Sequence, residues 1–201
     1  MKMKKQVVLG TKNQDKLREL QLLLKRSRIQ VLSLKDFPRC VEPKEDGRTF
    51  EANARKKAFF YSKHTKLPVL ADDSGLVVNA LKGKPGVYSA RFAGDNCTYA
   101  DNNQKLLGML KNVQRIKRKA RFVCVMALYD DGKFVKTVRG ECGGRIAFES
   151  RGKNGFGYDP VFIPKGFSKS FAELPLNIKN KISHRGKALR AAQHAILRYF
   201  N

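Results

Sequence analysis

Apolar positions recur at helical spacing in several stretches of the chain. One predicted helix runs from Thr49 to about Lys66. Thr49 can cap it, because the threonine hydroxyl can accept a hydrogen bond from a free backbone N–H group. The other predicted helices carry apolar residues three or four positions apart, at Leu17, Leu20, Leu23 and Leu24, then at Leu106, Leu107 and Leu110 within 100–110, and finally at Ala188, Leu189, Ala192, Ala195, Ile196 and Tyr199. These side chains are expected to point inward.

Short apolar runs between these helices predict β-strands. The predicted strands are Gln6–Gly10, Val31–Leu34, Val69–Ala71, Leu76–Leu81, Phe122–Tyr129, Lys133–Val138 and Val161–Ile163. The turn Asp130-Asp131-Gly132 joins Phe122–Tyr129 to Lys133–Val138 in a predicted hairpin. A glycine-bearing loop follows at Gly152–Gly157. Strands and helices together predict an α/β protein.

The chain has 201 residues and 42% hydrophobic content, which fits one large α/β domain or two closely apposed lobes. Its four cysteines show no C-x-x-C spacing, so they indicate reduced thiols and neither a zinc site nor a disulfide framework. The N-terminal apolar run is too short for a signal peptide, and no 18-residue apolar stretch occurs. We therefore expect a soluble, cytoplasmic protein with no membrane partner.

The net charge of +25, from 42 basic and 17 acidic residues, favours anionic ligands. The basic segment Arg115–Arg121 could contact phosphates, but it has no interleaved aromatic residues for base stacking. We interpret it as a solvated loop rather than a specific nucleic-acid site. Nucleotides satisfy the charge preference as well as nucleic acids do.

Two adjacent carboxylates, Asp72 and Asp73, interrupt the apolar run Leu70–Asn79. Like charges are costly to bury unless a cation or hydrogen bonds compensate them, and bound Mg²⁺ would do so. Alternatively, the strand ends here in a turn at Ser74-Gly75 and both acids are solvated. The pattern favours neither reading. Three further acidic residues precede the helix at Thr49 and could supply oxygen ligands: Glu42, Glu45 and Asp46. The usual preference for acidic residues near a helix N-terminus explains them equally well.

Three other junctions offer chemistry with an equally ordinary alternative. The loop Gly10–Lys16 lies between a strand and a helix, where backbone N–H groups can bind phosphate, although Asn13 can simply cap the helix. The loop Asn154–Pro160 carries two aromatic residues that could close over a flat ligand or pack structurally. The pair His184-Arg185 could contact the oxygen atoms of a base or form a surface pair at a helix start.

Together these segments closely resemble the inosine/xanthosine triphosphate pyrophosphatases, which remove nonstandard purine nucleotides. The matching segments are TKNQDK (11–16), TFEANARKKA (49–58), ADDSGLVVNALKGKPGVYSARFAG (71–94), FGYDPVF (156–162) and SHRGKAL (183–189). The resemblance implies that residues 1–201 form a single domain with an elongated central mixed β-sheet flanked by helices, two lobes with a nucleotide cleft between them, and a homodimer. It also implies Mg²⁺-dependent hydrolysis of inosine, deoxyinosine and xanthosine triphosphates to the monophosphate and pyrophosphate.

By this resemblance, Asp73 is the general base and a metal ligand, and Lys16 assists catalysis. The implied metal ligands are Asp73, Asp72 and Glu45, and the implied triphosphate and cleft residues are Thr11, Lys12, Asn13, Lys16, Ser74 and Arg91. The base and sugar pocket is implied for Phe156, Gly157, Tyr158 and Asp159, with Lys179, His184 and Arg185 at the base edge. The glutamate assignment departs from the family pattern, because Lys44 stands where many relatives have the first glutamate of E-E-T-G. Two alternatives stay open: a pyrophosphatase for other modified nucleotides and a basic nucleic-acid-binding protein.

Overall fold

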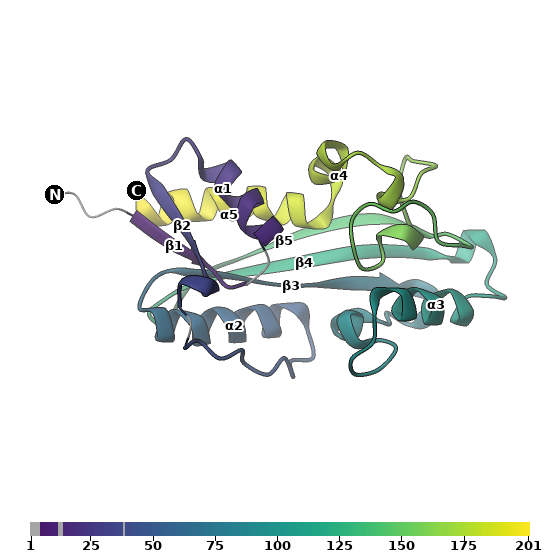
Figure 1. Ribbon diagram of the computed structural model, residues 1–201, viewed down its shortest axis with the longest axis horizontal. Coiled ribbons are helices and arrows are strands. Elements are labelled where there is room, and N and C mark those ends of the chain that lie inside the picture. The colour runs from purple at the N-terminus through teal and green to yellow at the C-terminus, as the bar shows by residue number, and fades with distance from the viewer. Residues whose placement is uncertain (1–4, 12–13, 38) are drawn as a thin grey trace. The chain divides into compact units, whose positions relative to one another are not determined.

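A computed structural model of the chain describes residues 5–11, 14–37 and 39–201 (Figure 1). Six strands form one mixed sheet in the order β2-β1-β3-β4-β5-β6, in which β1 pairs in parallel with β2 and β3, and β5 pairs antiparallel with β6. The strands are β1 (Lys5–Leu9), β2 (Ile29–Ser33), β3 (Val69–Val78), β4 (Lys119–Asp130), β5 (Lys133–Ile146) and β6 (Phe162–Pro164), and the helices are α1 (Gln14–Leu24), α2 (Phe50–Thr65), α3 (Tyr99–Met109), α4 (Leu176–Ile182) and α5 (His184–Phe200). The predicted α/β architecture with a mixed sheet and flanking helices is confirmed.

The chain divides into two compact units. Unit 1 comprises the described residues of Met1–Asp73 with Cys124–Gly140 and Ala188–Asn201, and unit 2 comprises Ser74–Val123 and Glu141–Lys187. Strands β3, β4 and β5 contribute residues to both units. A nucleotide cleft between two lobes stays a prediction.

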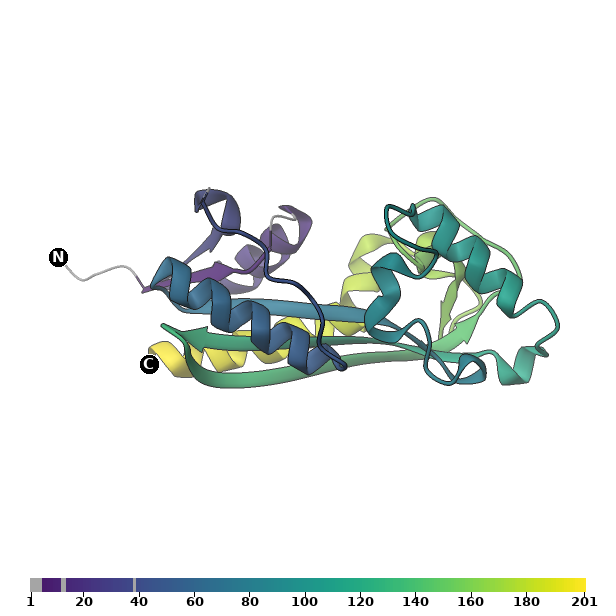
Figure 2. The same ribbon diagram turned by 90° about the horizontal axis from the view of Figure 1, so that it is seen from below.

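Unit 1 is built as helices on both faces of its part of the sheet. Figures 1 and 2 show α2 on one face, with α1 and α5 on the other. Thr49 caps α2 as predicted, because its Oγ1 accepts a hydrogen bond from Ala52 N at 3.0 Å, and the helix ends at Thr65 with Lys66 as its C-cap. The core on the α1 and α5 face consists chiefly of Val7, Leu9, Leu20, Leu24, Leu70, Met126, Leu128, Leu189, Ala192 and Ile196.

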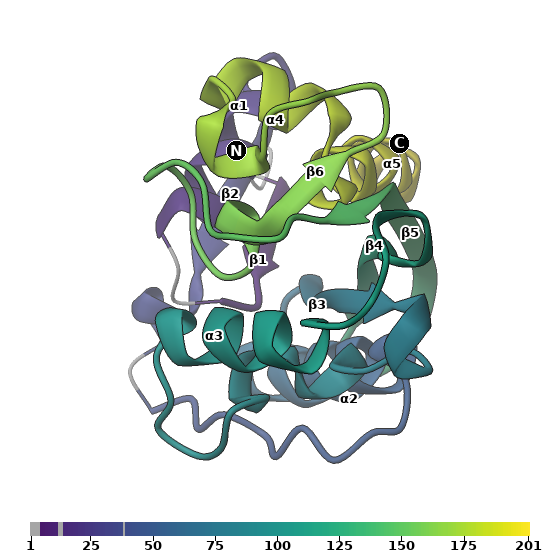
Figure 3. The same ribbon diagram turned by 90° about the vertical axis from the view of Figure 1, so that its right-hand side faces the viewer.

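Unit 2 has a separate core that is rich in aromatic residues. Helix α3 and the unit 2 parts of β3, β4, β5 and β6 contribute to it, and these elements are labelled in Figure 3. Phe122 packs edge-on against Phe162, with ring centroids 4.7 Å apart, and stacks at 6.0 Å on Phe171. From α3, Leu106 and Leu110 are buried in this core as predicted, while Leu107 is half-buried. Within the described residues of both units, no helix is long and apolar enough to span a membrane.

Four sequence predictions need correction. The segments at 69–71 and 76–81 are not separate, because β3 runs unbroken through Asp72, Asp73, Ser74 and Gly75 up to Val78, so the proposed turn is wrong. A short 3-10 helix at Asp159–Val161 delays the following strand to Phe162. Tyr199 does not point inward, since its hydroxyl donates to the carboxylate of Asp130 at the surface.

The fourth correction concerns the basic segment Arg115–Arg121, which is not a uniformly solvated loop. Arg118 is only 1% exposed. Its guanidinium donates to three backbone carbonyls, those of Leu110 at 2.6 Å, Ala147 at 2.7 Å and Val113 at 2.9 Å. A buried cation is tolerated when hydrogen bonds satisfy its donors. Through these bonds, Arg118 connects the backbone after α3 to the backbone after β5 inside unit 2.

Candidate functional site

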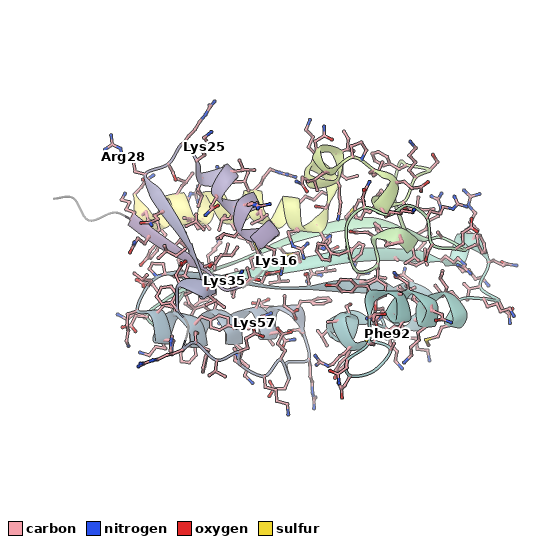
Figure 4. The ribbon with its side chains drawn as sticks, viewed as in Figure 1. Lys16, Lys25, Arg28, Lys35, Lys57 and Phe92 are labelled. Carbon is pink, nitrogen blue, oxygen red and sulfur yellow. The ribbon has the colours of Figure 1, made fainter. Side chains whose placement is uncertain are left out.

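Asp72 and Asp73 are both buried, with exposed fractions of 5% and 7%, but they have different partners. Lys16 Nζ, from α1, donates to both carboxylate oxygens of Asp72 at 2.8 and 2.9 Å. Asn53 Nδ2, from α2, donates to Asp73 Oδ2 at 2.9 Å. Consecutive strand residues point to opposite faces of a sheet, so the two carboxylates lie on the α1 and α2 faces respectively. Figure 4 labels Lys16 on the α1 side of the sheet and Lys57 on the α2 side.

Burial raises the pKa of Asp73 from 3.8 to about 6. The positive charge of Lys57 and the Asn53 hydrogen bond lower this pKa, whereas the negative charges of Glu45 and Asp72 raise it further. A carboxylate with a pKa near 6 is ionised at neutral pH yet basic enough to accept a proton from a bound water. The geometry and pKa therefore suit Asp73 for general-base chemistry.

Lys57 balances the negative charge around Asp73. Its Nζ lies 2.6 Å from Glu45 Oε1, and its side chain is 13% exposed. Burial opposes protonation, but the negative charges of Asp72, Glu45 and Asp73 outweigh it and raise the pKa of Lys57. Lys57 is therefore a permanent cation at this site. Of the other acids before α2, Asp46 pairs instead with the exposed Lys56 at 2.6 Å.

The donor chemistry around Asp73 fits a magnesium ion. Carboxylate oxygens are the ligands that Mg²⁺ prefers, and both Glu45 and Asp72 disfavour the ionised form of Asp73, which a divalent cation would relieve. As placed, no group of three acidic, histidine or cysteine side chains among the described residues is close enough to hold an ion. Ligand assignment to Asp73, Asp72 and Glu45 therefore stays a prediction.

The predicted triphosphate loop is described in part. The amide of Thr11 donates to Leu9 O at 2.7 Å, and a methyl group on Gly10 would lie 2.9 Å from Ala71 Cβ, so the chain turns tightly against β3 here. Lys12 and Asn13 lie outside the described residues. The structure thus brings Lys16 to Asp72 but leaves the phosphate-binding role of the loop as a prediction.

In unit 2 the predicted base-binding loop is held by one buried ion pair. Lys179 Nζ and Asp159 Oδ2 are 2.5 Å apart, and the same Oδ2 accepts a hydrogen bond from Phe156 N at 2.8 Å. Glycine is required at 155, because its φ is +77° and a Cβ there would lie 2.1 Å from Asp159 Oδ2. The loop conformation and the position of the Lys179 ammonium are therefore fixed together.

Phe156 is the exposed aromatic residue of this loop, with an exposed fraction of 40%. Lys179 Nζ and Arg185 Cζ each lie 5.2 Å from the centroid of its ring. Arg185 Nη2 also donates to Ser74 Oγ at 3.2 Å. Four predicted site residues, Phe156, Lys179, Arg185 and Ser74, are thus joined by direct contacts within unit 2.

Three other predicted residues make structural contacts in unit 2. Tyr158 is buried and its hydroxyl donates to Ser89 O at 2.9 Å. His184 is buried and stacks on Phe122, with ring centroids 4.6 Å apart and planes 8° apart. Arg91 Cζ lies 5.2 Å from the centroid of Tyr88. Their contacts with a ligand stay predictions.

Asn103 on α3 supports the base-binding loop but was not among the predicted site residues. Its Nδ2 donates to Gly157 O at 3.0 Å. Its Oδ1 is buried and has no hydrogen-bond partner among the described residues. An isolated polar residue in a helix gives no sequence signal for such a role. Asn53 and Lys57 were not predicted as site residues either, although they lie four residues apart and therefore on the same face of α2.

A family profile described as the Ham1 family matches residues 7–195. This chain belongs to the Ham1 family. The Ham1 chain is 48% identical over 194 residues to a dITP/XTP pyrophosphatase of Desulforamulus reducens, covering 96% of each sequence. It is 50% identical over 183 residues to a protein of the same name from Geobacter sulfurreducens, covering 91% of this chain and 92% of the relative.

Solved Ham1 structures have the same fold. A HAM1 protein from Coxiella burnetii superimposes with a TM-score of 0.89 at 41% identity, covering 96% of this chain and 99% of that one. The Staphylococcus aureus Ham1 protein gives the same TM-score at 37% identity, covering 98% of this chain and 100% of that one. The family resemblance and the fold predicted from the sequence are both confirmed.

Proposed function

We propose that this Ham1-family chain hydrolyses the triphosphates of inosine, deoxyinosine and xanthosine to the nucleoside monophosphate and pyrophosphate. The observation that carries the proposal is the buried Asp73, whose pKa of about 6 and hydrogen bond from Asn53 suit a general base. The relatives named dITP/XTP pyrophosphatase, at 48–50% identity over more than nine-tenths of the chain, support the choice of substrate.

In unit 1, Asp73 orients a water and accepts its proton as the water oxygen bonds to the α-phosphorus. The bond from this phosphorus to the bridging oxygen breaks, and that oxygen leaves with the pyrophosphate. Lys16, held by Asp72, provides positive charge for the departing phosphates. Mg²⁺, held by Asp73 with Glu45 as a further candidate ligand beside α2, would supply additional positive charge to the phosphates.

In unit 2, Phe156 offers a ring on which a purine can stack, and Lys179 and Arg185 offer cationic donors beside it. Donors favour the 6-oxo group of hypoxanthine and xanthine. Adenine carries an amino group at that position, which would leave a donor opposed by another donor. Asp159 positions the Lys179 ammonium for this contact.

Product analysis tests the proposed reaction. Purified protein is incubated with Mg²⁺ and, separately, with inosine, xanthosine, adenosine and guanosine triphosphates, and pyrophosphate and orthophosphate are quantified. We expect pyrophosphate, mainly from the first two. Orthophosphate, or no turnover of any of the four, would contradict the proposal. A modified pyrimidine triphosphate as a fifth substrate tests the alternative of a pyrophosphatase for other nucleotides.

We further propose that the protein is a cytoplasmic homodimer, on the basis of the family resemblance. Light scattering coupled to size-exclusion chromatography measures the mass in solution directly. A mass of one chain, 22.8 kDa, at the protein concentration used for turnover would contradict the dimer.

A further inference from the structure

Unit 2 contains a basic cavity of about 820 Å³ that has no part in the proposed pyrophosphatase chemistry. Of the predicted substrate, metal and catalytic residues that the structure describes, none lines it. Five of its lining side chains are cationic: Arg115, Lys119, Arg121, Arg145 and Lys165. We call these five residues the basic cluster.

Strand geometry explains why the cluster is gathered on one surface. On β4, Lys119 and Arg121 are two residues apart and point to the same side, while Ala120 and Phe122 between and after them are largely buried. On β5, Arg145 lies between Gly144 and the buried Ile146. These strands and the neighbouring β6 can be followed in Figure 3.

The backbone leaves room between the cationic side chains. Gly143 shares the strand face of Arg145, and a Cβ at Gly143 would meet no atom within 4 Å. Lys165 N donates to Gly143 O at 2.9 Å, which places Lys165 next to this open backbone. An extended ligand can therefore approach the backbone at Gly143 with a cationic side chain on either side.

The charge of the cluster is largely uncompensated. Among the described residues, no acidic side chain lines the cavity. Arg121 Nε of the cluster lies 3.8 Å from Glu141 Oε2, and both side chains are about 40% exposed. Such an exposed pair contributes little attraction. Mutual repulsion among five cations disfavours the cluster unless an anion binds to it.

The lining also indicates what kind of anion fits. In the part of the chain that the structure describes, no aromatic residue lines the cavity, so these residues offer no surface on which bases could stack. Its cations come from the 3-10 helix Arg115–Lys117, two strands and the residue after β6, which suits several phosphates in a row better than one small ion. We propose that the basic cluster binds the phosphate backbone of a nucleic acid without reading its sequence.

Salt dependence tests this proposal with a matched pair of triple variants. The first, K119Q/R121Q/R145Q, removes three cations from the cluster. The second, K25Q/R26Q/R28Q, removes one lysine and two arginines that are exposed on unit 1, two of which are labelled in Figure 4. Both variants have the same net charge, so an effect of overall charge would appear equally in both.

Binding of a fluorescent 20-nucleotide single strand is measured between 50 and 200 mM salt, with a duplex of equal length in parallel. Each phosphate neutralised contributes a slope of about −0.7 for single strands, so K119Q/R121Q/R145Q should lose about 2 from the slope of log K against log salt. At the lowest salt we expect about tenfold weaker binding or more. The control triple should keep the wild-type slope, and both variants should keep wild-type turnover of inosine triphosphate.

Equal losses in the two triple variants would overturn the proposal, because net charge alone would then explain the binding. Binding of inorganic polyphosphate at the cluster without any binding of either oligonucleotide would overturn it too. Turnover is measured on the same preparations. Failure of the pyrophosphatase proposal is therefore recognised separately from failure of this one.

Discussion

Asn53 links Asp73 to the segment that precedes α2. Its Nδ2 donates to Asp73 Oδ2 at 2.9 Å, and its Oδ1 accepts a hydrogen bond from Gly47 N at 2.7 Å. The same amide therefore orients the proposed base and fixes the chain next to Glu45. Gly47 packs closely against this side-chain amide, since a Cβ at position 47 would lie 2.5 Å from Asn53 Oδ1.

Replacing Asn53 with alanine should move the acid limb of the pH profile of kcat/KM to higher pH. The hydrogen bond from Asn53 lowers the pKa of Asp73, so its loss makes the carboxylate protonate at higher pH. Thr49→Ala is the control, because it removes the cap of the same helix and should cost about 1 kcal/mol of stability without moving the limb. Equal displacement of the limb in both variants would indicate a merely structural effect.

Asp73→Asn should abolish turnover and stabilise the fold at neutral pH. Ionised Asp73 is destabilising above its folded pKa of about 6, because the unfolded value is near 3.8, and the two-unit difference corresponds to about 3 kcal/mol at most. This penalty declines as the pH falls through 6 and is absent below 3.8. Urea unfolding at pH 8 and near pH 4 measures the gain, which should be confined to the higher pH. Wild-type rates in the variant would falsify the role of Asp73.

Lys16 and Asp72 should be strongly coupled in stability. Lys16→Met leaves a buried carboxylate without its ion pair, so it should destabilise by about 3 kcal/mol, whereas Lys16→Met with Asp72→Asn should recover much of the loss. Chemical denaturation of the two single variants and the double variant gives the coupling energy. If the losses of stability in the two single variants add up to the loss in the double variant, the ion pair contributes nothing to the free energy of unfolding. Turnover should stay low in the double variant, because the charge on Lys16 is proposed to act on the phosphates.

Two glycines of the base-binding loop form a matched pair. Gly155→Ala places a methyl group 2.1 Å from Asp159 Oδ2 at φ +77°, whereas Gly157→Ala meets no atom within 4 Å at φ +62°. Backbone strain alone should cost about 1 kcal/mol at Gly157, and the collision should cost several kcal/mol more at Gly155. We expect KM for inosine triphosphate to rise mainly in Gly155→Ala. Similar kinetics in both variants would argue against the Asp159–Lys179 pair as the determinant of the loop.

Arg118→Met should lower the free energy of unfolding by about 4 kcal/mol. The substitution leaves three buried carbonyls without their donor, and each lost hydrogen bond to a charged group contributes about 1.5–3 kcal/mol before relaxation. The neighbouring Lys117→Met is the control, because Lys117 is exposed and should change stability by less than about 0.5 kcal/mol. Thermal unfolding distinguishes the two. Equal melting temperatures would show that Arg118 is not a structural residue.

Local signals in the sequence predicted the elements that depend on near neighbours. The Thr49 cap follows from one hydroxyl and a backbone N–H three residues away, and the hairpin at Asp131–Gly132 follows from a turn between two apolar runs. The odd position of Asp72 and Asp73 in an apolar run also singled out the candidate site. The sequence does not determine whether they are buried or solvated, because Ser74-Gly75 is equally compatible with a turn.

Long-range contacts account for what the sequence did not predict. Arg118 looks like its basic neighbours, and one of its acceptors, the carbonyl of Ala147, lies 29 residues further along the chain. The buried imidazole of His184 likewise stacks on Phe122, which is 62 residues earlier in the sequence. No local pattern distinguishes such side chains from solvated ones. For the same reason Asn103 could not be linked to Gly157.

The separate partners of Asp72 and Asp73 make the alignment of β3 a functional property. Val8 and Leu9 of β1 lie opposite Val69 and Leu70, and this pairing decides which carboxylate faces α1 and which faces α2. A shift of one residue would turn Asp72 to the α2 face and Asp73 to the α1 face. A single-residue insertion between Pro68 and Asp72 would thus retain every catalytic side chain yet place Asp72 where Asp73 now faces Asn53. Chain length within this strand is as much a part of the site as the identity of its residues.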